Sequence, residues 1–111
     1  MKKSMTTNTI QRLNDAFRSS FLGGRVMLTA GIRMRSNQEV AEILERIRTF
    51  NQFNQDNDPY GHHDFASFEY KGDTIFWKID YYDKQYEFGS ENPADPSKTN
   101  RVLTIMTAEE Y

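Results

Sequence analysis

The chain of 111 residues has no cysteine, only three prolines, and no apolar run that approaches the roughly 20 residues of a membrane helix. Without cysteine, disulfides, thiolate nucleophiles, iron–sulfur clusters and thiolate zinc sites are excluded. The segment 5–11, after the basic residues 1–4, is polar where a secretory signal needs an apolar stretch. We therefore expect one soluble, cytoplasmic domain over residues 1–111, with flexible ends at 1–7 and 108–111 and no contact with a membrane.

Charge is unevenly distributed along the chain. Residues 1–50 carry nine Lys/Arg against four Asp/Glu, whereas residues 51–111 carry five against twelve, so that halves of +5 and −7 give the net charge of −2. If the halves fold against each other, much of this charge cancels; if they do not, two faces of opposite sign result. A pI near 5.6 is far from that of a dedicated nucleic-acid binder.

Two stretches have the spacing of amphipathic helices. In the first, apolar residues recur three and four apart after the cap candidates 7–9, and the pair Gly23–Gly24 ends the pattern: Ile10, Leu13, Phe17 and Phe21. In the second, Ser36 and Glu39 form a capping box ahead of Val40, Ile43, Leu44, Ile47 and Phe50.

Alternation predicts the strands. Apolar residues alternate with polar ones over 26–32, and the segments 65–70 and 74–82 flank the short turn 71–73 and indicate a hairpin. In its second arm the odd residues 75–81 form the core face, including Trp77. We also expect a short strand at 86–88 and a closing strand at 102–106. The predicted fold is α+β, with two helices on one face of a mainly antiparallel sheet of four to five strands.

The loop between the second helix and the hairpin holds five candidate metal ligands within nine residues. The five are Asp56, Asp58, His62, His63 and Asp64. The set proposed for one ion is Asp56, Asp58, His63 and Asp64, whose carboxylates and imidazole suit zinc, manganese or iron. A calcium loop of the EF-hand type is excluded, because its fifth and twelfth positions are Tyr60 and Ser67. The alternative is that the aspartates form turns around Pro59 and a histidine ties the loop to the hairpin.

Acid–base catalysis is a second hypothesis for this region. His63 could act as a base oriented by Asp64 or Asp80, with Tyr60 or Tyr82 as proton donor, in a small hydrolase. No nucleophile elbow and no phosphate-binding glycine loop accompanies these residues. The sequence therefore favours binding over catalysis, and we expect no cofactor.

The even-numbered face of the second hairpin arm predicts a partner-binding surface. Aromatic residues mixed with charge are typical of interfaces, and the candidates are Tyr60, Phe76, Lys78, Tyr82 and Asp83. A nucleic-acid alternative draws on the arginines of the first half: Arg33, Arg35, Arg46 and Arg48. Conversely, the acidic half could imitate a phosphate backbone for a basic partner.

Several segments along nearly the whole chain are similar to one family: 13–18, 23–26, 57–61, 63–65, 76–83, 93–96 and 101–106. They resemble a domain-of-unknown-function family of short bacterial proteins that are often encoded on plasmids and other mobile elements. The chain differs from the family pattern at His62, where an acidic residue is typical, and at Ala66, where glycine is typical. The resemblance implies no reaction, but it implies a mobile-element accessory factor. We expect such a factor to bind and modulate, or inhibit, a host protein or nucleoprotein complex.

Overall fold

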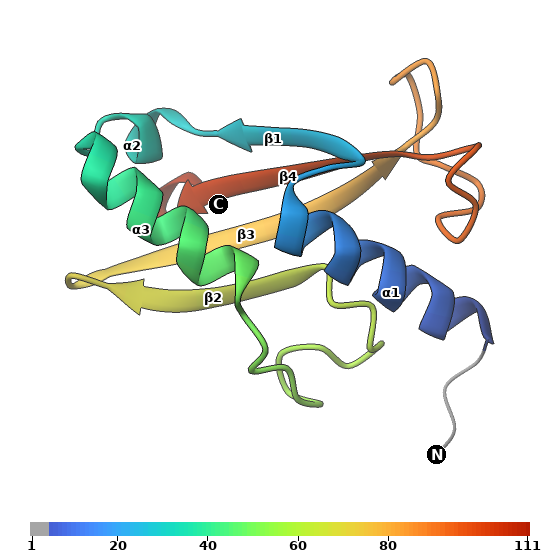
Figure 1. Cartoon of the computed structure of the whole chain (residues 1–111), viewed down its shortest axis with the longest axis horizontal. Helices are drawn as coiled ribbons and strands as arrows, with labels where there is room; N and C mark the ends of the chain where they lie inside the picture. Colours follow the sequence, from blue (N-terminus) through green and yellow to red (C-terminus); the bar gives the residue numbers. More distant parts are fainter. Residues whose placement is uncertain (1–4) are drawn as a thin grey trace.

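The structure, a computed structural model, describes residues 5–111 and contains three α-helices, four strands and a short 3-10 helix (Figure 1). In chain order these are α1 (Met5–Ser20), β1 (Gly24–Leu28), α2 (Ala30–Arg33), α3 (Asn37–Arg48), β2 (Phe65–Tyr70), β3 (Asp73–Tyr82), β4 (Asn100–Thr107) and η1 (Ala108–Glu110). Residues 5–7 of the expected flexible start belong to α1, and residues 1–4 lie outside the described part of the chain. The expected flexible end, 108–111, includes η1.

The sheet has four strands in the order β1-β4-β3-β2. The pairs β2–β3 and β3–β4 are antiparallel, whereas β1 and β4 run parallel. The α+β prediction is confirmed, with a mixed, mostly antiparallel sheet. The parallel pair arises because β1 is connected to the rest of the sheet through α2 and α3, a crossover that can return the chain in the same direction.

The expected alternation along β3 is confirmed. Ile75 and Trp77 are fully buried and Ile79 is nearly so, whereas the even-numbered residues between them are partly exposed. The odd-numbered side chains pack against Phe17 of α1 and against Ile43 and Ile47 of α3 in one core cluster. A strand with period-two burial thus forms the centre of a two-layer fold.

The start of α3 follows its sequence signal in part. The Ser36 hydroxyl accepts a hydrogen bond from the backbone N–H of Glu39, at 3.1 Å. The Glu39 carboxylate instead contacts the side chains of Arg35 and Lys71, each at 3.3 Å. Half of the predicted capping box is therefore present, because two cations compete for the carboxylate.

Three expected elements differ from the structure. The first strand ends at Leu28, and Ile32 is buried in α2 instead, because residues 28 and 32 also fit helical spacing. No strand forms at 86–88; a turn in which Tyr86 has a positive φ of 57° leads to a single bridge between Tyr82 and Gly89. The helix α1 begins before the cap candidates 7–9.

The two long helices cover one face of the sheet only (Figure 1). The shortest dimension of the molecule is 23 Å, against 39 and 35 Å for the others. One sheet and one helix layer, each about 10 Å thick, account for that dimension. We call the opposite side the outer face. Within residues 5–111, no helix is long and apolar enough to cross a membrane.

Candidate functional site

The outer face consists of side chains whose positions follow from strand register. Residues directly opposite each other in neighbouring strands share a face, and Phe76 pairs with Ser67 of β2 and with Met106 of β4. The face therefore comprises the even residues 74–82 of β3 and 100–106 of β4, together with the odd residues 65–69 of β2 and 25–27 of β1. Of the predicted partner residues, Phe76, Lys78 and Tyr82 lie here together.

One end of the outer face carries three aromatic rings, which we call the aromatic triad: Phe65, Phe76 and Tyr111. The Phe65 and Phe76 ring centroids are 5.6 Å apart with the rings 25° from parallel, and the Tyr111 centroid lies 5.6 Å from Phe65 and 5.0 Å from Phe76. Such separations are typical of interacting aromatic pairs. Tyr111 nevertheless remains 71% exposed. The triad thus presents aromatic surface to solvent.

The Glu110 side chain fixes the position from which Tyr111 reaches this face. Its carboxylate accepts hydrogen bonds from the Thr29 hydroxyl at 2.6 Å and from the backbone N–H groups of Gly31 at 2.8 Å and Thr107 at 3.0 Å. These bonds lower the pKa of Glu110 to about 2, with the Thr29 hydroxyl as the largest cause. The end of β4, η1 and α2 are therefore held together by one ionised side chain.

Of the predicted partner residues, Lys78 lies in the middle of the outer face, whereas Asp83 and Tyr60 lie elsewhere. Lys78 and Asp80 form an ion pair at 3.2 Å in the middle of the outer face. The Asp83 carboxylate accepts from the backbone N–H groups of Gln85 and Glu87 and so stabilises the turn after β3. Tyr60 is 79% exposed but lies beside His62, whose carbonyl is bound by α1, and hence on the helical side of the sheet.

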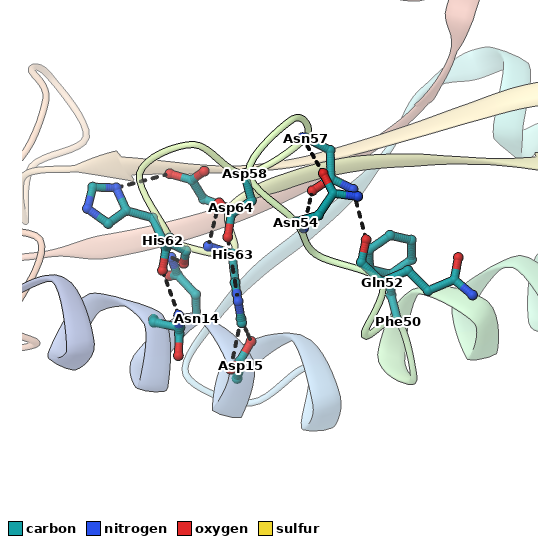
Figure 2. A network of polar contacts seen from close by, with 12 residues as sticks. Asn14, Asp15, Phe50, Gln52, Asn54, Asn57, Asp58, His62, His63 and Asp64 are labelled. Atoms are coloured by element: carbon teal, nitrogen blue, oxygen red, sulfur yellow. Dashed lines mark hydrogen bonds and ion pairs between the residues drawn. The ribbon is translucent and has the colours of Figure 1, made fainter. Parts of the chain in front are cut away.

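The second predicted site, around His63, has a different geometry from the one expected (Figure 2). The ring Nδ1 lies 2.9 Å from the Asp15 carboxylate of α1, and Nε2 lies 3.5 Å from that of Asp58. The Phe53 ring stacks on the imidazole at 3.8 Å. His63 also has a positive φ of 56°, a conformation that these contacts hold in place. The carboxylates beside His63 are those of Asp15 and Asp58 instead of Asp64 or Asp80.

Asp15 extends this contact to the end of α3. Arg18 donates to Asp15 at 2.9 Å and to the carbonyl oxygens of Ile47 at 2.9 Å and Phe50 at 3.0 Å. A guanidinium at the last carbonyls of a helix satisfies acceptors that lack intrahelical partners and complements the helix dipole. Together the contacts of Asp15, Arg18, His63 and Asp58 form what we call the loop clamp, which fastens residues 51–64 to α1 and α3.

A second polar network connects the same loop to the sheet. The buried amide of Asn14 donates to the His62 carbonyl at 2.9 Å and to the Tyr81 hydroxyl at 2.7 Å, and accepts from Arg101 Nε at 2.7 Å. The Tyr81 hydroxyl donates to Asp64 at 2.8 Å. Burial, followed by the charge of Asp64, raises the pKa of Tyr81, and burial lowers that of Arg101. Asp64 thus binds a neutral tyrosine.

The metal hypothesis finds no assembled ligand set in the part of the chain from 5 to 111, where no three His, Cys, Asp or Glu residues are placed to hold an ion. Asp58 and His63 are neighbours, whereas Asp56 donates its backbone N–H to Asn54 Oδ1 at 2.8 Å within the loop. Asp64 is bound by Tyr81. The carboxylates of Asp58 and Asp64 thus accept hydrogen bonds from the His63 backbone N–H and the Tyr81 hydroxyl.

The arginines of the nucleic-acid alternative are mostly engaged within the protein. Arg35 pairs with Glu39 and Asp73, Arg48 pairs with Glu45, and the Arg46 guanidinium lies 4.5 Å from the centre of the Phe68 ring. Arg33 is exposed in α2. Three of the four arginines therefore have a carboxylate or an aromatic partner within the protein.

Sequence reasoning missed residues whose partners are distant along the chain. Asp15 is 48 residues from His63, and Asn14 is 87 residues from Arg101, so no local pattern joins them. The position of Phe65 could have been predicted from the sequence, because the alternation of residues 65, 67 and 69 places its side chain on the outer face. Tyr111 was assigned to a flexible tail.

Residues 28–110 match the sequence model of a family described as protein of unknown function (DUF3768). The chain belongs to this family. The matched range begins at the last residue of β1, so it includes α2, α3, β2, β3 and β4, whereas α1 lies before it. No curated protein and no solved structure matches the chain. The DUF3768 description names no activity, and the functional argument therefore depends on the geometry.

Proposed function

We propose that this DUF3768 protein is an interaction module that binds another protein through its outer face. The observation that carries the proposal is a central sheet covered by helices on one side only, with the aromatic triad and the half-exposed Tyr82 on the other. Exposed aromatic side chains close to charged groups are typical of binding surfaces. The partner, on this proposal, is a host protein or nucleoprotein complex that the module modulates or inhibits.

Support for the mobile-element setting comes from the family resemblance alone, whereas support for the surface comes from the fold. The outer face also contains Met27, which is 52% exposed, and the partly exposed Val102, which pairs with Arg25. Its charged centre, the Lys78–Asp80 pair, is about 40% exposed at each side chain. An apolar surface with a partly solvated ion pair suits a partner that associates reversibly.

The absence of cysteine from the chain makes a site-specific test direct. Ser67 is exposed between Phe65 and Glu69 on the outer face, and Ala41 is exposed on the helical side. The variants Ser67→Cys and Ala41→Cys each carry one photo-crosslinker, and both proteins are exposed to lysate of the native host. We expect the outer-face probe to capture a defined protein that the helical-side probe does not capture.

The capture is then repeated in the presence of an excess of unlabelled protein. Unlabelled wild type should compete, and unlabelled Phe76→Ser/Tyr82→Ser should not, because the variant lacks two aromatic contacts. Trp77 fluorescence confirms that the variant is folded. Equal capture by the two probes, or equal competition by wild type and variant, would falsify the proposed function.

A further inference from the structure

The aromatic triad differs from six other aromatic rings of residues 5–111, each of which has a cation of the chain over it. Arginine side chains lie over the rings of Phe68, Tyr81 and Tyr86 at 4.5, 5.2 and 4.2 Å from the ring centres. Buried Trp77 likewise has the Arg18 guanidinium 5.2 Å from its ring. Among residues 5–111, no cation of the chain lies over any ring of the triad.

The triad is also held in a defined arrangement. Phe65 and Phe76 project from adjacent paired strands, and Tyr111 is positioned by the hydrogen bonds of Glu110 to Thr29 and Gly31. Because strands and a pinned helix support all three rings, little conformational entropy is lost when a group docks on them. The Tyr111 ring, at 71% exposure, has most of its surface free for such a contact.

The charge around the triad favours a cation. The outer face carries two carboxylates and two cations. The Arg25 guanidinium lies over the Tyr86 ring at the β1 edge, and Glu69, whose carboxylate accepts from the Thr74 hydroxyl, lies on the same strand and face as Phe65. The nearby cation, Lys78, is already paired with Asp80 at 3.2 Å. With that pair balanced, Glu69 is the carboxylate of β2 on this face that attracts positive charge, and the triad is the apolar surface on which a cation can rest.

We infer that the triad is a docking site for an arginine side chain in a basic segment of the partner protein. The guanidinium stacks on the Phe76 and Tyr111 rings, and Glu69 provides a carboxylate within the same face. Arginine is favoured over lysine because its planar, weakly hydrated guanidinium stacks on aromatic rings. This inference rests on the proposed function and specifies the chemistry of the partner.

The test uses three peptides of equal length: octa-arginine, octa-lysine and octa-citrulline. Citrulline keeps the planar shape of arginine without its charge. Binding to the isotope-labelled full chain is followed by amide chemical shifts at neutral pH. We expect octa-arginine to shift the amides of Phe65, Phe76 and Tyr111, octa-lysine to bind more weakly at these positions, and octa-citrulline not to bind.

Variants separate the triad from general attraction to an acidic protein. Phe76→Leu/Tyr111→Leu should weaken octa-arginine binding by about two- to fivefold per ring removed, since a cation–ring contact at an exposed site contributes a modest amount. Tyr60→Leu, which removes an equally exposed ring on the helical side, should leave the affinity unchanged. Glu69→Gln should weaken binding at low salt more than at high salt.

Equal affinities for octa-arginine and octa-lysine, or an octa-arginine affinity that Phe76→Leu/Tyr111→Leu leaves intact, would overturn the inference. The photo-crosslinking result is independent of it. If the Ser67 probe still captures its partner while the arginine peptide shows no preference for the triad, the outer face binds by other chemistry and only the arginine site is wrong. If the probes at positions 67 and 41 capture the same proteins to the same extent, the proposed function itself is wrong.

Discussion

Asn14 shows how a single polar residue can determine the packing of α1. Its side chain is fully buried and uses both amide hydrogens and its oxygen, which join the His62 carbonyl, the Tyr81 hydroxyl and Arg101. A buried amide is stable only when its hydrogen-bonding groups are satisfied. Asn14 therefore specifies one docking position of α1 on the sheet and the loop, where an apolar residue would allow several.

Replacement of Asn14 by alanine tests this role. Asn14→Ala leaves the Arg101 Nε donor and the His62 carbonyl without that partner, and we expect a loss of about 2–4 kcal/mol of unfolding free energy, the cost of two buried unpaired groups. Asn8→Ala makes the same chemical change at an exposed position of α1 and should alter stability by less than about 0.5 kcal/mol. Urea unfolding followed by Trp77 fluorescence measures both; similar losses would contradict the buried network.

At the scale of elements, the loop clamp replaces regular structure over residues 51–64. His63 lies between the carboxylates of Asp15 and Asp58, and Asp15 also binds Arg18. The Nδ1–Asp15 contact, at 2.9 Å, is within hydrogen-bond distance, and Nε2 lies 3.5 Å from the Asp58 carboxylate. The histidine proposed as a catalytic base from the sequence therefore lies against two carboxylates, one from α1 and one from its own loop.

A double-mutant cycle measures the coupling energy between Asp15 and His63 in the loop clamp. Asp15→Ala and His63→Ala each destabilise the protein, and we expect the double variant to lose less than the sum, with a coupling energy of about 0.5–1.5 kcal/mol, as for side chains in direct contact. Asp56→Ala with His63→Ala serves as the matched cycle. Asp56 belongs to the predicted metal set but is not bonded to His63, so its coupling should be near zero. Coupling in the Asp56 cycle alone would favour a shared ligand over the clamp.

The link between η1 and α2 depends on the ionisation of one carboxylate. The folded pKa of Glu110, about 2, is below the ordinary value of 4.5, so the ionised form is the one that the fold stabilises. Its contribution is therefore complete above pH 4.5 and is lost as the pH falls from 4.5 towards 2. In a pH titration by NMR, the Gly31 amide shift should change with a midpoint near 2, and this change should disappear in Glu110→Gln. A midpoint near 4.5 would show that η1 is not held in this way.

Local patterns in the sequence predicted local structure well and long-range pairing poorly. The alternation of β3 and the Ser36 cap are properties of neighbouring residues, and both are present. The parallel pairing of β1 with β4 joins residues more than 70 positions apart, for which period-two alternation is equally compatible with either direction. The same limit applies to the site: Phe76 and Lys78 could be assigned to one face, but Tyr111 and Asp15 reach their partners only through the folded chain.

As a whole, the molecule is flatter than a typical domain of its length. Its radius of gyration is 14.2 Å, with extents of 39, 35 and 23 Å, and a compact chain of this length is expected near 13 Å. The radius of gyration is larger than expected because the sheet has helices on one side only. A four-stranded sheet has an area of roughly 500 Å² on its uncovered side, which approaches half of the 1,200 Å² or more that a specific interface buries in total.

Two adjacent residues of β3 distinguish an open outer face from a covered one. Ile75 is fully buried against the helices, and Phe76 lies partly exposed on the opposite side. Ile75→Thr should cost about 2–4 kcal/mol, because it places a hydroxyl without a partner in the core. Phe76→Thr should cost less than about 1.5 kcal/mol, since threonine suits a strand and the lost contacts of the partly exposed ring include those with Phe65 and Tyr111. Urea unfolding of both variants gives the comparison, and equal costs would mean that the outer face is buried in solution.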